Sequence, residues 1–99
     1  MANIVIKKRI DLDFLGEDHK DSYLIFKAMP VVEYQSFIKN TPEKRIDEIN
    51  YIVKIMQEKF IEGKFGAENV EAKDLPQFDE GTLAKCFAVL TGQADPKVE

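Results

Sequence analysis

The sequence has one cysteine, no tryptophan and no long apolar run. Cys86 has no partner for an internal disulfide or a CxxC motif, and a chain without disulfides suits a reducing compartment. No stretch approaches the ~18 consecutive apolar residues of a membrane-spanning helix. The opening residues, MANIVIKKRI, also lack the basic start and longer apolar core of a signal peptide. These absences predict a soluble protein of the cytoplasm that does not interact with membranes.

An excess of positive charge is also missing. The 99 residues include 14 Lys and Arg against 18 Asp and Glu, a net charge of -4. This balance provides no general attraction to nucleic-acid phosphates or anionic membranes. The basic clusters Lys7–Arg9 and Lys44–Arg45 are interleaved with acids, as is typical of solvated faces. The hydrophobic fraction of 44% suffices for one modest core, and the length supports one domain.

Alternating apolar and polar residues predict a first β-strand over residues 4–14, with one buried face. Lys8 is the one polar residue of the apolar parity, which indicates a bulge or a strand edge. Residues 22–29 are typical of a second strand, but their continuous apolar run leaves its facing open. The simplest arrangement is an antiparallel hairpin. The buried parity of the first strand consists of Ile4, Ile6, Ile10, Leu12 and Phe14.

Three helices are predicted, over residues 30–39, 42–62 and 80–91. The longest carries an apolar stripe with 3-4-3-4 spacing, formed by Ile46, Ile49, Val53, Met56 and Phe60. Thr41 is a candidate cap for its first turn, Pro42 suits its first position, and Gly63 can end it.

The last helix has Asp79 as its candidate N-cap and Gly92 at its end. Its stripe is formed by Leu83, Phe87 and Leu90, with Cys86 beside them. Residues 63–78 predict a loop with a short helical turn at 71–75. We therefore expect an α+β fold in which a small N-terminal hairpin (4–14 and 22–29) packs against three helices. One domain would span residues 1–92, followed by a flexible polar tail at 93–99.

Nothing in the sequence indicates a catalytic, cofactor-binding or metal-binding residue. The acids around His19 have no register of a calcium loop, and one histidine without a nearby cysteine is a weak zinc site. His19 also lacks a nucleophile motif, and Cys86 falls in an apolar stripe, where it acts as a small hydrophobe. We therefore predict no enzyme activity and no cofactor.

The long helix carries a second set of apolar residues beside its main stripe: Tyr51, Ile52, Ile55 and Ile61. Two explanations stay open. The helix is buried on two sides within the domain, or its second face packs against another subunit or a client protein. The sequence alone does not say which face belongs to the core.

Two segments are informative when taken together: IDLDFLGEDHKDSYLIFKAMPVVEYQSFI, with two strands and a proline-started helix, and the C-terminal LAKCFAVLTG. Together they resemble the small tail assembly chaperones of long-tailed, siphovirus-like bacteriophages and prophages. The resemblance covers residues 4–92. It rests on patterns of apolar residues and turns.

The resemblance implies a non-enzymatic role in the host bacterial cytoplasm. Such chaperones bind the tape-measure protein, a long hydrophobic helical client, while tail-tube subunits assemble, and many also exist in a frameshifted longer form. The candidate partner-binding residues are Tyr51, Ile52, Ile55 and Phe87, and homo-oligomers are possible. The alternatives are a structural virion component, such as a head-tail connector or tail-tube ring protein, and a small prophage-encoded adaptor.

Overall fold

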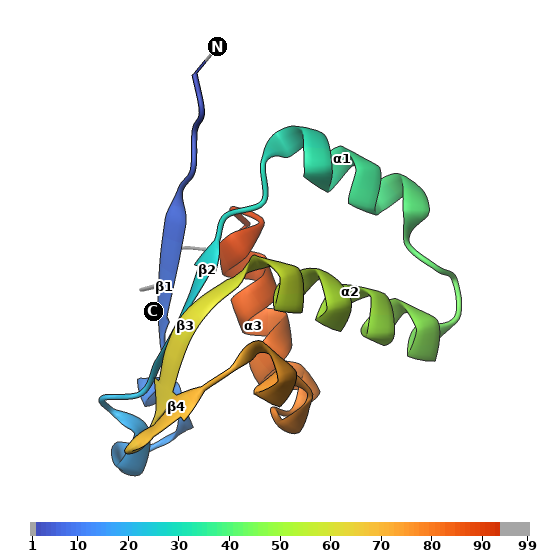
Figure 1. Ribbon diagram of the computed structural model, residues 1–99. Coiled ribbons are helices and arrows are strands. Elements are labelled where there is room, and N and C mark those ends of the chain that lie inside the picture. Colours follow the sequence, from blue (N-terminus) through green and yellow to red (C-terminus); the bar gives the residue numbers. More distant parts are fainter. Residues whose placement is uncertain (1, 94–99) are drawn as a thin grey trace.

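The computed structural model describes residues 2–93, which build a four-stranded antiparallel sheet with helices packed on one face (Figure 1). The α+β fold class is therefore confirmed. The strands are β1 (Lys7–Asp11), β2 (Tyr23–Lys27), β3 (Phe60–Phe65) and β4 (Glu68–Val70). The α-helices are α1 (Val31–Asn40), α2 (Arg45–Lys59) and α3 (Glu80–Leu90), and 3₁₀ turns occupy Asp13–Leu15, Glu17–His19 and Ala72–Gln77.

The sheet has the order β1-β2-β3-β4, so the predicted N-terminal hairpin exists but forms only half of it. Ile10 of β1 lies opposite Leu24 of β2, and both are buried beneath the helices. This pairing decides the facing of the second strand, which the sequence left open. Regular pairing of the first strand covers Lys7–Asp11 and not residues 4–14. Its predicted buried parity is right for Ile10 and Leu12 but wrong for the ends of the segment, because Ile4, Ile6 and Phe14 lie outside the strand and are exposed. Lys8 pairs regularly with Phe26 on an edge strand, so it marks a strand edge and not a bulge.

The predicted long helix is wrong at both ends. α2 begins at Arg45, with Lys44 as its N-cap residue, and the Thr41 hydroxyl instead donates a 2.6 Å hydrogen bond to the Phe37 carbonyl at the end of α1. At Phe60 the backbone becomes extended, with φ -66° and ψ 135°, and the chain enters β3. Phe60 satisfies the helical spacing, but here it pairs with Phe26 across the sheet.

Gly63 therefore has a different role from the one predicted. It does not end a helix but lies in β3 opposite Leu24. A Cβ atom built on Gly63 would lie 2.6 Å from Leu24 Cδ2 and 2.9 Å from the Tyr23 carbonyl oxygen. Only glycine allows β3 to approach β2 this closely at that position.

The predicted loop over residues 63–78 is also wrong, because most of it is structured. β3 and β4 form a hairpin whose turn contains Gly66 at φ +65°, a conformation that favours glycine. The helical turn expected at 71–75 is confirmed as the 3₁₀ segment Ala72–Gln77. It starts with a capping box, in which Glu71 and Asp74 each accept a hydrogen bond from the other's backbone.

α3 agrees with its prediction. Asp79 accepts a hydrogen bond from the Thr82 backbone, and Gly92 follows the helix at φ +83°. Gln93 is the only residue of the predicted tail that the structure describes, and it donates a 2.6 Å hydrogen bond to the Tyr34 hydroxyl. Residues 94–99 lie outside the described residues.

The core lies between the sheet and α3, with α2 contributing from one side (Figure 1). Of the predicted α2 stripe only Met56 is fully buried, and Ile46 is 68% exposed. α1 has no buried residue and lies outermost. The buried apolar side chains are Ile10, Leu12, Leu24, Phe26, Met29, Met56, Leu75, Leu83, Cys86, Phe87, Val89 and Leu90.

Candidate partner-binding grooves

A groove runs on each side of α2, and together the two grooves contain all four predicted partner-binding residues. Ile52 and Phe87 line the groove between α2 and α3. Tyr51 and Ile55 line the groove between α1 and α2. The predicted set thus gathers around one helix but is divided between two surfaces.

The α2–α3 groove, with a volume of about 190 Å³, has an apolar floor and polar ends. At one end Arg45 forms ion pairs with Glu48 of its own helix and with Glu80 at the start of α3. Gln93 lies at the other end. The floor is lined by Ile49, Ile52, Val53, Leu83, Ala84, Phe87 and Ala88. An apolar floor with polar ends suits an amphipathic helix that brings an apolar face and polar flanks.

The α1–α2 groove, of about 350 Å³, is more polar. Lys59 Nζ lies 2.5 Å from Glu33 Oε2, so an ion pair ties α2 to α1 across it. The Lys59 side chain is only 15% exposed, because its aliphatic stem is covered while its charged end meets Glu33. The Glu33–Lys59 ion pair therefore both bounds this groove and holds α1 against α2.

Phe37 of α1 connects the two grooves. Its ring stacks on Tyr51 of α2, with centroids 5.6 Å apart and planes 9° apart. It also lies 5.0 Å from the Phe87 ring of α3. The Phe37 side chain is half-buried. Because its ring contacts both Tyr51 and Phe87, this one side chain joins all three α-helices. This role of Phe37 was not predicted from the sequence, because it depends on where α2 and α3 lie relative to α1.

The four predicted residues differ in how much surface they offer. Phe87 is only 9% exposed and belongs to the core. Tyr51, Ile52 and Ile55 are half-buried. Ala84 is an exposed lining residue of the α2–α3 groove that the prediction did not include. A partner in this groove would meet Ile52 and Ala84 before it met Phe87.

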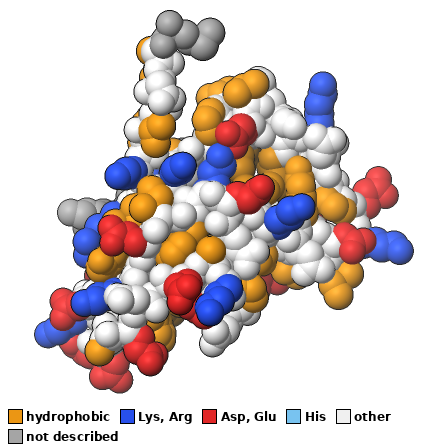
Figure 2. All heavy atoms as spheres, in the orientation of Figure 1, with side chains coloured by type: hydrophobic (Ala, Val, Ile, Leu, Met, Phe, Trp, Pro, Cys, Tyr) orange, Lys and Arg blue, Asp and Glu red, His pale blue; other side chains and the backbone are white. Residues whose placement is uncertain are grey.

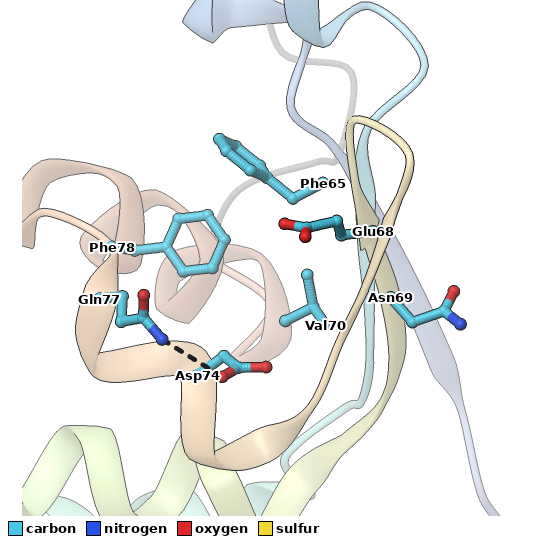
Figure 3. A pocket seen from close by; sticks show the side chains of 7 residues that line it. All are labelled: Phe65, Glu68, Asn69, Val70, Asp74, Gln77 and Phe78. Atoms are coloured by element: carbon cyan, nitrogen blue, oxygen red, sulfur yellow. Dashed lines mark hydrogen bonds between the residues drawn. The ribbon is translucent and has the colours of Figure 1, made fainter.

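A hollow larger than either groove lies elsewhere, between the β3–β4 hairpin and the 3₁₀ segment Ala72–Gln77, with a volume of about 610 Å³. In Figure 3, Phe65, Phe78 and Val70 point into it and Asn69 points away. Asp74 already accepts hydrogen bonds from Gln77 and from the Glu71 backbone. Its polar lining includes two carboxylates, those of Glu68 and Asp74.

Cys86 behaves as the sequence predicted, as a small buried hydrophobe. It is fully buried in α3, and burial raises the pKa of its thiol from 9.0 to about 12. A thiol with that pKa is not a nucleophile near neutral pH. The neighbouring Lys85 points away, and its Nζ lies 4.3 Å from the centroid of the Phe14 ring.

Within residues 2–93, no cluster of three or more His, Cys, Asp or Glu side chains is placed to bind a metal ion. In the same described part of the chain, every helix is too short or too polar to cross a membrane. Hydrophobic side chains do reach the surface over the start of α1, at the top of Figure 2.

No match to this chain is found among protein-family models, curated proteins or solved structures. The fold and the two grooves are therefore described from this chain alone.

Proposed function

We propose that the protein is a non-enzymatic tail assembly chaperone that binds the tape-measure protein of a long-tailed bacteriophage or prophage in the host cytoplasm. The family comes from the resemblance of Ile10–Ile38 and Leu83–Gly92 to such chaperones. The structural observation that supports it is the α2–α3 groove, which has an apolar floor and an Arg45–Glu80 ion pair at one end.

A tape-measure protein presents long apolar helices that aggregate until the tail tube surrounds them. A chaperone for such a client must cover apolar helix faces and release them again. A shallow groove with polar ends suits this reversible binding better than a deep pocket does. Ile52 and Ala84 line the groove between α2 and α3, and they would contact the apolar face of a helix bound there.

The test is co-expression with a tape-measure protein or an apolar helical fragment of it, followed by measurement of the soluble client fraction. Ala84→Glu changes an exposed position, so the chain should fold normally. The new charge in the groove should reduce the soluble client fraction by about tenfold. Gln35→Glu, an exposed change on α1 outside both grooves, is the matched control and should act like the wild type. Equal client solubility with both variants would exclude this groove.

A second variant tests the face that the sequence identified. Replacing Ile52 and Ile55 with glutamine should weaken client binding more than folding, because both side chains are only half-buried. If the double variant unfolds the isolated domain, these residues are core and do not form a binding face. Circular dichroism of the purified variant separates the two outcomes.

One observation favours the alternative of a structural virion component, such as a head-tail connector or tail-tube ring protein. Within residues 2–93, β1 has no partner strand on its outer side, and an open edge can pair with a neighbouring subunit. A ring-forming protein would show a mass of many subunits by light scattering. A chaperone would be a monomer or a small oligomer that binds the client and, during assembly, the tail-tube protein.

A further inference from the structure

The N-terminal segment, residues 2–6, continues the line of β1 beyond the end of β2 and projects from the molecule (Figure 1). We refer to it as the arm. Its three large apolar side chains are exposed: Ile4 by 75%, Val5 by 54% and Ile6 by 55%. Three consecutive exposed aliphatic side chains form an apolar patch, and such a patch on a folded protein often marks an interaction site.

The sheet register shows which backbone groups of the arm and β1 are free. Ala28 donates to the Ile6 carbonyl at 2.7 Å, and Leu12 donates to the Ser22 carbonyl at 2.9 Å. In an antiparallel ladder the hydrogen-bonded residues alternate, so even-numbered residues of this strand face β2. The odd-numbered residues, from Val5 to Asp11, therefore direct their N–H and C=O groups to the open edge.

The charges along that edge restrict what can pair with it. Lys7, Lys8 and Arg9 follow directly after the arm. A second copy aligned antiparallel with Lys7 or Lys8 at the centre would place these cations opposite one another, which is unfavourable. With Ile6 at the centre, Val5 would face Lys7 and Ile4 would face Lys8.

Centring the pairing on Val5 avoids these conflicts. Val5 then faces Val5 of the second copy, Ile4 faces Ile6, and Lys7 faces the neutral Asn3. The outward-facing backbone groups of Val5 also meet their equivalents, as the ladder requires. Among the registers centred on residues 5 to 8, this is the only one that keeps the apolar residues of the arm together and the basic residues apart.

We propose that the arm is a dimerisation strand that pairs antiparallel with the arm of a second copy, with Val5 on the two-fold axis. The contact is isologous, so it closes after two copies and forms no ring. It brings together two copies of Ile4 and Ile6 on the face of the sheet that the helices cover. Val31 and Val32 at the start of α1 are further exposed aliphatic side chains, by 73% and 71%.

Cross-linking tests the register. A Val5→Cys variant should form a disulfide-linked dimer under mild oxidation, because the two Val5 positions are direct partners. Lys7→Cys is the matched control, since in this register the two Lys7 positions are offset by four residues, about 13 Å along the strand. Cys86 stays in both variants because it is buried. Non-reducing gels should show at least tenfold faster dimer formation for Val5→Cys.

Light scattering over a range of protein concentrations tests the dimer without a cysteine. The wild type should approach twice the monomer mass of 11.4 kDa, while Val5→Asp should stay a monomer with an unchanged melting temperature. A wild type that is monomeric at every concentration, or equal cross-linking rates for both cysteine variants, overturns the proposal. A mass of many subunits also overturns it. The proposal is wrong as well if Val5→Asp causes loss of a bound client protein and leaves the association of two copies unchanged. None of these outcomes depends on whether the α2–α3 groove binds a tape-measure protein.

Discussion

At the scale of single residues, the positions with the strictest requirements are those where two elements come closest. Gly63 is such a position, because there β3 lies directly beside Leu24 of β2 in the sheet. Cys86 is another, since it fills space between α3 and the sheet without using its thiol chemistry. Burial at Cys86 was predictable from its stripe. The role of Gly63 was not, because it depends on which strand lies beside it.

Gly63→Ala should destabilise the fold by about 1–3 kcal/mol, because the new methyl group would overlap Leu24 and the Tyr23 carbonyl and push β3 away from β2. Urea unfolding followed by circular dichroism measures the change. Lys64→Ala, an exposed change at the next residue of the same strand, should alter stability by less than about 0.5 kcal/mol. Equal stability of Gly63→Ala and the wild type would mean that β3 has room to shift.

At the scale of elements, the helix ends show where local signals are sufficient. Asp79 caps α3 in the way its sequence position predicts, because a cap needs only its own next turn. The start of α2 could not be predicted from Thr41 and Pro42, since the Thr41 hydroxyl binds the end of α1. Its end at Lys59 depends on β2, which offers Phe60–Phe65 a strand partner.

The Asp79 cap should make α3 sensitive to acid. Hydrogen bonding, mainly from the Thr82 hydroxyl at 2.5 Å, lowers the pKa of Asp79 below its ordinary value of 3.8. A carboxyl group whose pKa is lower in the folded state stabilises the fold fully above pH 3.8. That contribution is lost as the pH falls from there through the lower folded pKa.

Thermal unfolding at pH 7 and at pH 3 checks this expectation. Asp79→Ala should lower the melting temperature at pH 7. The difference in melting temperature between this variant and the wild type should be smaller at pH 3, because the wild-type carboxylate becomes protonated as the pH falls. Asp79→Asn is the control, because asparagine also caps helices but does not titrate. A difference between Asp79→Ala and the wild type that is the same at both pH values would contradict the proposed role of the charge.

At the scale of the whole molecule, α1 is the least integrated of the three α-helices. It has no buried residue and is held by Phe37, by the Glu33–Lys59 ion pair and by the hydrogen bond from Gln93 to Tyr34. The sheet and α3 share the core, so α1 should open locally before the rest unfolds. The α1–α2 groove, which Glu33, Ser36 and Phe37 line, changes shape if it does.

Phe37→Ala should release α1 from α2 and α3, because it removes the ring that contacts both Tyr51 and Phe87. We expect a loss of about 1–3 kcal/mol, the range for a partly buried aromatic contact. Hydrogen exchange of the α1 amides should accelerate at least tenfold while β2 stays protected. Ile38→Ala, at a position 59% exposed on the same helix, should leave both unchanged. Faster exchange throughout the sheet would show that α1 is part of the cooperative core.

The sequence by itself determined the α+β class, the buried parity of Ile10 and Leu12, the Asp79 cap and the burial of Cys86. Each of these depends on hydrophobic periodicity or on hydrogen bonds within one turn, and such information lies within a few consecutive residues. Only the tertiary structure decided that Phe60–Phe65 leaves the helix, that the sheet has four strands, and that Tyr51 and Ile52 face different grooves. Phe60 satisfies the spacing of a helix as well as that of a strand. The choice therefore lies with β2, whose free edge offers backbone hydrogen bonds that a longer α2 would leave unmade.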